Sequence, residues 1–195
     1  VPYIMQIVAH GKLICAGTLI KPDIIASAAS CFYGKKFKRD ELMAVGGAQI
    51  DRDPHGIRRF IKKIYMSNKF TLSSHTSNLA AVTLYKPLDD AKTKPIALCS
   101  HSFSVGAEVH ISGWHFMTDS GTHAERLRTT TIDILPKEEC KVDAEELTTD
   151  TVCGSTDVCH DDLGDPGIIN NEFCAMISYV TKCEGNHHPI FTNIY

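Results

Sequence analysis

The sequence has no long apolar run, and no stretch approaches the roughly 18 residues that a membrane-spanning helix needs. Its first residues, Val1-Pro2-Tyr3, lack the charged and apolar regions of a signal peptide, so a secreted form would already be processed. Basic residues are not in excess either, because 20 Lys and Arg stand against 23 Asp and Glu. The resulting net charge of −3 disfavours general nucleic-acid binding. An Asn-x-Ser/Thr sequon is absent, so glycosylation gives secretion no support.

Closely spaced C-x-x-C pairs, which are typical of zinc sites, are missing from a chain that has eight cysteines. An even and high cysteine count in 195 residues favours disulfide bonds and an oxidising compartment over a metal site. We therefore predict an extracellular protein that holds no metal and no cofactor. The cysteines are Cys15, Cys31, Cys99, Cys140, Cys153, Cys159, Cys174 and Cys183.

Helical periodicity is scarce, and short β-branched and apolar runs alternate with turn residues such as Gly46-Gly47 and Asn170-Asn171. The length suits one ordinary domain or two small packed halves. Many short strands at this spacing predict an all-β barrel or sandwich. The predicted strands are Tyr3–Val8, Ile24–Ala28, Ile57–Met66, Leu79–Leu84, Glu108–Ser112, Leu127–Leu135 and Phe173–Tyr179.

Two segments differ from this pattern. Pro136–Leu147 carries four glutamates around Cys140 and is expected to form a short helix. The polar segment Pro87–Pro95 is expected to link two halves, one over about 1–90 and the other over 91–195.

Four segments resemble the motifs of the trypsin-like serine proteases. Cys15–Ile20 is similar to the family's C-G-G-S-L-I, and Ser27–Cys31 is similar to S-A-A-H-C. Ile111–Trp114 resembles I-S-G-W, and Cys159–Pro166 resembles C-x-G-D-S-G-G-P. The motifs stand in the family's order, and the resemblance covers nearly the whole chain. It implies a single domain of two six-stranded antiparallel β-barrels with the active site between them.

The resemblance also implies which cysteines form disulfide bonds. Cys99 and Cys174 occupy no usual family position, and they are expected to pair because an even remainder tends to do so in an oxidising compartment. The family pairs are Cys15–Cys31, Cys140–Cys153 and Cys159–Cys183.

The family's chemistry needs a nucleophilic hydroxyl, an imidazole base and a carboxylate that orients the imidazole. The base, carboxylate and nucleophile positions of this chain hold Ser30, Asn78 and Leu163. A hydroxyl is no base at neutral pH, an amide cannot stabilise an imidazolium, and leucine has no nucleophilic atom. Neighbouring cysteines fix the alignment of Ser30 and Leu163, whereas Asn78 is aligned only through the apolar run that follows it. We therefore predict a protein without protease activity.

Ten histidines are alternatives for the missing base. A rebuilt triad would still need a serine where Leu163 stands, so a surface or loop role is the preferred interpretation of each histidine. They are His10, His55, His75, His101, His110, His115, His123, His160, His187 and His188.

The surroundings of the triad positions also depart from the family pattern. Asp161 replaces a glycine whose N–H serves the oxyanion hole, and its carboxylate would repel a developing oxyanion. Asp157 matches the acidic residue that binds Lys or Arg in trypsin-like members. Val180 replaces a glycine that the family has at the pocket entrance. A second glycine of the family pattern, next to the position of Ile190, is deleted from this sequence. We expect a narrowed or closed specificity pocket in which Asp157 is a relic.

Together these losses are most similar to the inactivated serine protease paralogues of the scabies mite. That resemblance implies a secreted protein that binds host proteins and interferes with complement or another defence cascade. Phe32–Asp40 and Lys69–Asn78 are candidate binding loops. Residual cleavage after Arg or Lys is a weaker hypothesis.

The alternative function is glycosaminoglycan binding, similar to that of the heparin-binding inactive members of the family in neutrophils. Two basic runs support it: Lys35–Arg39, and Arg58-Arg59 with Lys62-Lys63. Charge that is simply solvated on loops is the competing interpretation. Acidic residues concentrate in the second half, which predicts a molecule with a basic and an acidic side.

Overall fold

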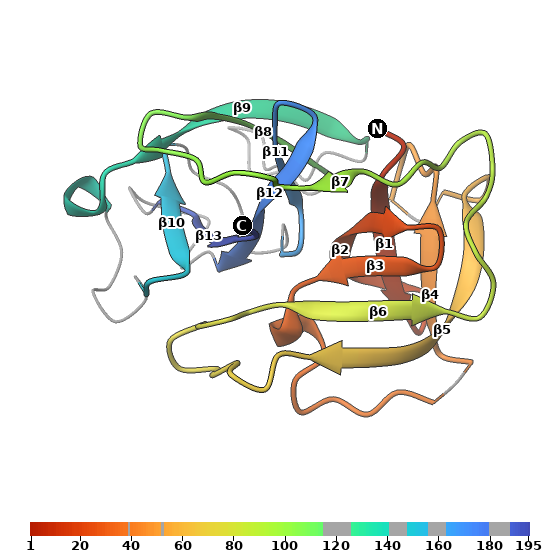
Figure 1. The fold of residues 1–195 in the computed structure, drawn as a ribbon. Helices are drawn as coiled ribbons and strands as arrows, with labels where there is room; N and C mark the ends of the chain where they lie inside the picture. The colour runs from red at the N-terminus through yellow and green to blue at the C-terminus, as the bar shows by residue number, and fades with distance from the viewer. Residues whose placement is uncertain (39, 52, 115–125, 141–147, 156–162, 180–187) are drawn as a thin grey trace.

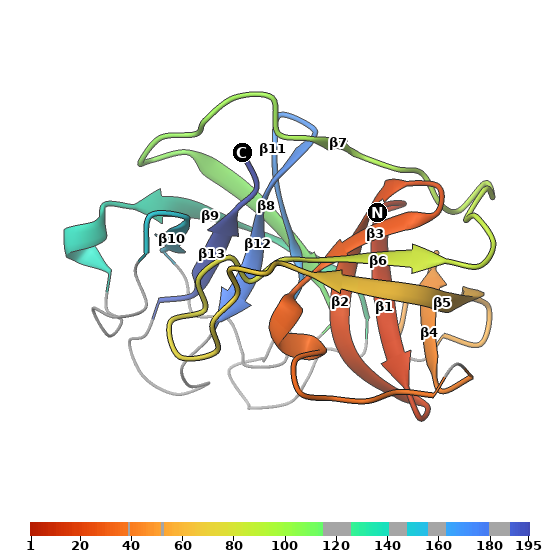
Figure 2. The same ribbon diagram turned by 60° about the horizontal axis from the view of Figure 1, so that its bottom comes forward.

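The computed structural model describes residues 1–38, 40–51, 53–114, 126–140, 148–155, 163–179 and 188–195. Within these ranges the strands form two sheets that lie side by side, one from each half of the chain (Figures 1 and 2). No helix of the described residues has the length and apolar character needed to cross a membrane.

The first sheet is a closed antiparallel barrel with the strand order β1-β2-β3-β6-β5-β4. A hairpin at His10-Gly11, where both residues have positive φ, joins the first two strands and matches the preferred geometry of two-residue turns. The inward side chains, among them Met5, Ile7 and Leu19, are fully buried. The strands are β1 (Ile4–Ala9), β2 (Lys12–Lys21), β3 (Ile24–Ser27), β4 (Leu42–Gly46), β5 (Ile57–Met66) and β6 (Ala80–Leu84).

The second sheet has the order β11-β8-β9-β10-β13-β12, and the pairing of β11 with β12 closes it into a second six-stranded antiparallel barrel. The short strand β7 adds to β12 in parallel. Asn170 and Asn171, both at positive φ, form the predicted turn between β11 and β12. The strands are β7 (Ala97–Leu98), β8 (Glu108–Gly113), β9 (Arg128–Leu135), β10 (Thr151–Gly154), β11 (Pro166–Ile169), β12 (Glu172–Tyr179) and β13 (Ile190–Asn193).

The barrels pack against each other through apolar side chains. Trp114, at the end of β8, is 1% exposed and packs with Ile4 and Val45 of the first barrel. Phe173 and Met176 of β12 belong to the core cluster of the first barrel. This packing forms an interface between the two barrels. The predicted double-barrel fold is confirmed.

Helical structure is confined to two 3₁₀ turns within the described ranges, η1 (Ala29–Cys31) and η2 (Lys137–Glu139). In the described part of the segment expected to be helical, Pro136–Leu147, the structure has the three-residue turn η2. Residues 141–147 lie outside the described part. Cys140 leaves η2 in an extended conformation and forms a disulfide bond to β10, which ends the turn.

Three disulfide bonds are present among the described residues. Cys15–Cys31 and Cys140–Cys153 are two of the pairs that the family resemblance implied. Cys99–Cys174 is the additional bond, and it joins the chain next to β7 to the middle of β12. Cys159 and Cys183 lie outside the described residues.

Candidate functional site

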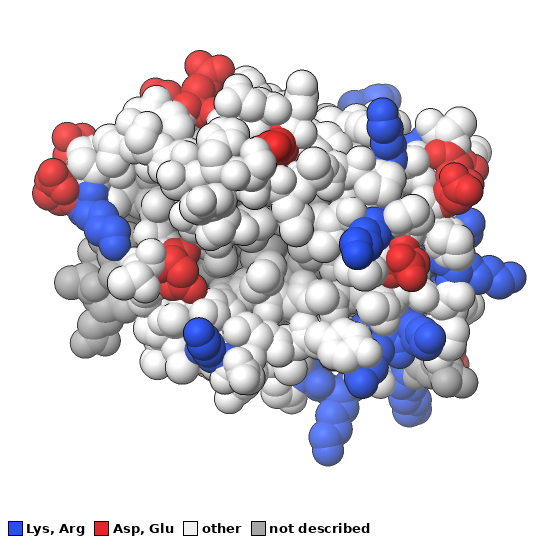
Figure 3. Space-filling model, viewed as in Figure 1, with Lys and Arg blue, Asp and Glu red and all other residues white. Residues whose placement is uncertain are grey.

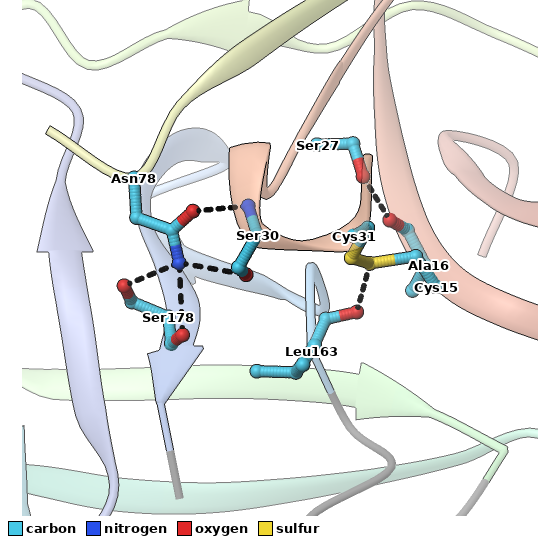
Figure 4. Close-up of a disulfide and its surroundings, with 8 residues drawn as sticks. All are labelled: Cys15, Ala16, Ser27, Ser30, Cys31, Asn78, Leu163 and Ser178. Atoms are coloured by element: carbon cyan, nitrogen blue, oxygen red, sulfur yellow. Dashed lines mark hydrogen bonds between the residues drawn. A yellow bond between two sulfur atoms is a disulfide. The ribbon is translucent and has the colours of Figure 1, made fainter. Parts of the chain in front are cut away.

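The three triad positions meet at the interface of the barrels, as Figure 4 shows. β3 runs directly into η1, which carries Ser30, and Asn78 lies just before β6. Leu163 comes from the second half, shortly before β11, and Ser178 comes from β12. The structure therefore assembles residues that are up to 148 positions apart in the chain into one site.

Asn78 is fully buried and forms the centre of a hydrogen-bond network. Its Oδ1 accepts the backbone N–H of Ser30 at 2.8 Å, and its Nδ2 donates to Ser30 Oγ at 3.1 Å. Nδ2 also lies 2.9 Å from both the carbonyl oxygen and the hydroxyl oxygen of Ser178. The N–H of Ser30 requires an acceptor and the Ser178 carbonyl requires a donor, so these two groups fix the orientation of the amide.

This network joins the two barrels through neutral groups. The amide links the two barrels through Ser178, and all its polar atoms are engaged with neutral partners. The hydroxyl of Ser30 accepts a hydrogen bond from Asn78, and no basic group contacts it within the described part of the chain. Proton abstraction would need such a base.

Leu163 stands where a nucleophile would be required, and its backbone is held in place. The Leu163 carbonyl accepts the N–H of Ala16 at 2.9 Å, and the following Gly164 donates to Ile177 at 2.9 Å. Gly164 has φ +87°, and a Cβ there would lie 2.2 Å from the carbonyl oxygen of Ala16. The turn is thus tightly built, but the side chain it presents is a half-buried hydrocarbon that packs on the core.

The neighbouring serine hydroxyl is also engaged. Ser27 is fully buried, and its Oγ donates to the Ala16 carbonyl at 2.7 Å. The Cys15–Cys31 disulfide holds β2 against η1 beside it (Figure 4). Ser27 therefore stabilises the barrel wall and offers no free nucleophile.

His75, three residues before Asn78, stacks on Tyr179 of β12 with the ring centroids 4.1 Å apart. Its Nδ1 is buried without a hydrogen-bond partner among the described residues. Burial lowers the pKa of His75, because a charged imidazole would lose its hydration there. The ring is held by stacking on Tyr179, and no hydrogen bond joins it to a serine among the described residues.

Asp150 anchors the same loop from the second barrel. Its carboxylate accepts hydrogen bonds from the backbone N–H of Ser77 at 2.7 Å and from the Ser77 hydroxyl at 3.2 Å. Burial acts to raise the pKa of Asp150, but hydrogen bonds from Thr148 and Ser77 outweigh it and hold that pKa below its usual range. Asp150 was not among the predicted site residues, because no local motif marks a contact between residues 73 positions apart.

The stacked ring predicts a pH dependence of stability. Below about pH 6.5 the unfolded chain takes up a proton at His75 that the buried ring resists, so the folded state loses stability as the pH falls. We expect the melting temperature to fall more steeply between pH 7 and pH 5 in the wild type than in His75→Asn, because asparagine tolerates the φ of 51° and does not titrate. Thermal unfolding by circular dichroism measures this, and identical pH profiles would contradict the assignment.

The other predicted site residues are those of the oxyanion hole and of the specificity pocket. Asp157, Asp161 and Val180 lie outside the described residues, so the altered oxyanion hole and the closed pocket remain predictions. Ile190 is described, and it is a fully buried residue of β13 that pairs with Cys153 and Tyr179.

A resident metal has little to bind in the described residues. The one group of potential ligands there is Cys99, Glu172 and Cys174. Both sulfurs of this group form a disulfide bond, so they are not available as thiolates.

The double barrel, with its triad positions at the barrel interface, defines the class of this protein as trypsin-like. A sequence model of the family described as Trypsin matches residues 1–195, and the chain belongs to this family. Among its relatives, Seminase of Drosophila melanogaster is 26% identical over 202 aligned positions, which cover 99% of this chain and 73% of that protein. Serine protease SP24D of Anopheles gambiae is 25% identical and covers 96% of this chain and 70% of its own length.

Many solved structures share the fold. Neuropsin, a serine protease of mouse brain, superposes with a TM-score of 0.86 at 20% identity, covering 99% of this chain and 89% of neuropsin. The scabies mite inactivated protease paralogue S-D1 superposes with a TM-score of 0.87 at 21% identity, covering 99% and 87% of the two chains. At these identities the similarity concerns the fold.

Proposed function

We propose that this chain is a non-catalytic, secreted member of the trypsin family that acts by binding other proteins. The observation that carries the proposal is the use made of Asn78. A buried amide whose oxygen accepts from Ser30 and whose nitrogen donates to Ser178 holds the barrels together where catalysis needs a charged carboxylate.

The loss of the nucleophile supports the same conclusion independently. Leu163 has no heteroatom that could attack a carbonyl carbon, although its backbone is fixed by Ala16 and Gly164. Each triad function is therefore absent for its own chemical reason. A single reversion cannot restore a covalent mechanism whose members act as a unit.

The two candidate binding loops form one surface, which supports a role in protein binding. Tyr33 of the first loop meets Phe70 of the second edge to face, with the ring centroids 5.3 Å apart. Tyr33 is 50% exposed and Leu72 is 53% exposed. Exposed aromatic and aliphatic side chains in adjacent loops are typical anchors of protein interfaces.

The test of inactivity uses a fluorophosphonate probe for reactive serines and fluorogenic peptides with Arg or Lys before the scissile bond. We expect no labelling and no turnover above buffer. We also expect the Ser30→His, Asn78→Asp, Leu163→Ser variant to stay inactive, because Asp161, Val180 and Ile190 still differ from the family pattern.

The controls separate a dead site from a damaged preparation. An active trypsin must be labelled under the same conditions, and circular dichroism must show that the triple variant is folded. Labelling of the wild type would overturn the proposal, whereas turnover by the folded triple variant would overturn the prediction about the oxyanion hole and the pocket.

We propose host defence proteins, complement components among them, as the partners, on the basis of the resemblance to inactivated mite paralogues. Complement-mediated lysis in serum tests this directly. We expect the wild type to reduce lysis and a Tyr33→Ser, Leu72→Ser variant to reduce it less, while Tyr195→Ser, an exposed aromatic residue outside these loops, behaves as the wild type does. Unchanged lysis with the wild type would reject complement as the target.

A further inference from the structure

The two basic runs of the first half meet around one hollow in the surface of the first barrel. One run lies in the loop after η1, and the other lies on β5. The volume of the hollow is about 600 Å³, and the apolar and aromatic residues that line it are Phe37, Leu42, Ile61, Ile64 and Tyr85. The basic residues that line it are Lys35, Lys36, Lys38, Lys62 and Lys63.

Most of these ammonium groups are free to bind an external anion. Lys38 has a carboxylate partner, because its Nζ lies 3.7 Å from Glu41. In the described ranges no carboxylate lies within 4.0 Å of the ammonium groups of the other four lysines. Lys63 Nζ is held 4.4 Å from the centre of the Tyr65 ring, which positions its charge without neutralising it.

The arginines of the second run have a different role. Arg58 donates to the backbone carbonyls of Asp53, Pro54 and Gly56, and Arg59 donates to the carbonyl of Pro87 at 3.0 Å. Neither lines the hollow. Within the described residues, Arg58 and Arg59 therefore hold loops, whereas the lysines of both runs surround the hollow. Arg39 of the first run lies outside the described residues.

Charge is distributed unevenly over the molecule. Residues 1–90 contain 13 Lys and Arg against 7 Asp and Glu, whereas residues 91–195 contain 7 against 16. The formal charges of the halves are therefore +6 and −9, which give the total of −3. In Figure 3 the basic side chains gather at the lower right, over the first barrel. A polyanion is drawn to this side and repelled from the other.

We infer that the lysine-lined hollow is a binding site for a sulfated polysaccharide chain, an activity separate from the proposed protein binding. Lysine ammonium groups are compact point charges that suit sulfate groups along a polymer. The partly exposed ring of Tyr85 can pack against the C–H faces of sugar rings. Aromatic rings also stack on the bases of single-stranded nucleic acids, so a comparison with DNA of equal charge is part of the test.

Titration with size-defined heparin fragments in 50–300 mM NaCl tests the site. We expect Lys35→Gln, Lys36→Gln, Lys62→Gln, Lys63→Gln to weaken binding at 150 mM NaCl by about tenfold or more. The slope of log affinity against log salt should become shallower by about 3, because each lost ionic contact removes about 0.7. Glutamine keeps most of the side-chain length, so the hollow retains its apolar walls.

A charge-matched variant removes four exposed lysines that do not line the hollow: Lys12→Gln, Lys21→Gln, Lys69→Gln and Lys94→Gln. We expect it to lose less than about threefold in affinity, since long-range charge is screened at this salt concentration. Unsulfated hyaluronan should bind weakly, and single-stranded DNA of equal charge should bind less tightly than heparin. Equal losses in both variants, tighter binding of the DNA, or no heparin binding at 150 mM NaCl would each overturn the inference.

Discussion

Replacing Asn78 by aspartate, the residue of the family pattern, is expected to destabilise this protein by about 2–3 kcal/mol at pH 7. The carboxylate would be fully buried, and it would face the Ser178 carbonyl oxygen to which the amide now donates at 2.9 Å. The N–H and hydroxyl of Ser30 can still donate to it, so the loss is less than that of an isolated buried charge. The free energy of unfolding in urea measures the effect.

The cost should depend on pH in a defined direction. Burial raises the pKa of the introduced carboxyl above its unfolded value, so the folded state binds the proton more tightly and the variant recovers stability as the pH falls toward 4. Asn68→Asp makes the same chemical change at an exposed residue and should stay within about 0.5 kcal/mol of the wild type. If Asn78→Asp were as stable as the wild type at pH 7, the amide network would not be what holds the interface.

Removal of the Cys99–Cys174 disulfide is expected to be the most destabilising change, at about 4 kcal/mol. The bond closes a loop of 75 residues, and the entropy that a cross-link removes from the unfolded chain grows with loop length. In a chain of this size, we expect the melting temperature of Cys99→Ala, Cys174→Ala to fall by about 10–15 °C. Calorimetry under non-reducing conditions measures both quantities.

The Cys140–Cys153 bond provides a matched comparison, because it closes only 13 residues and also joins a half-buried cysteine to a buried one. Cys140→Ala, Cys153→Ala should cost about 3 kcal/mol on the same scale. A larger loss from the short loop than from the long one would show that local packing, rather than the restriction of the unfolded chain, dominates.

Much of the barrel architecture could be predicted from the pattern of residues. β5 was predicted with its observed bounds, and the ends of β6 and β12 moved by one residue. The observed strands that were not predicted are β2, β4, β7, β10, β11 and β13. Three of them, β10, β11 and β13, are only four residues long. Strands this short are stabilised by pairing with other strands, as β10 is with β13 and β11 with β12, rather than by any periodicity of their own.

The candidate site divides in a similar way. The residue types at Ser30, Asn78 and Leu163 could be assigned from neighbouring motifs, because cysteines and glycines next to two of them fix the alignment. The partners of these residues could not be assigned. Ser178 lies 100 positions from Asn78, and Asp150 lies 73 positions from Ser77, so their contacts exist only after the barrels pack.

The contacts of the basic residues, like those of the candidate site, could not be predicted from the sequence. Their charge is evident in the sequence, but the arginines and lysines of one strand proved to have different roles. Side chains alternate between the two faces of a strand, and the Pro87 carbonyl that accepts from Arg59 lies 28 positions away in the chain. Only the folded chain shows which charges are free.

The sequence by itself led to the prediction that triad chemistry is lost, because a hydroxyl, an amide and a hydrocarbon at these positions cannot act as base, charged orienter and nucleophile. The tertiary structure decided what these residues and their neighbours do instead. It places the Asn78 amide across the barrel interface, stacks His75 on Tyr179 and surrounds one hollow with lysines from two segments. These arrangements arise from contacts between distant parts of the chain, which hydrogen bonding and burial specify only once both barrels have formed.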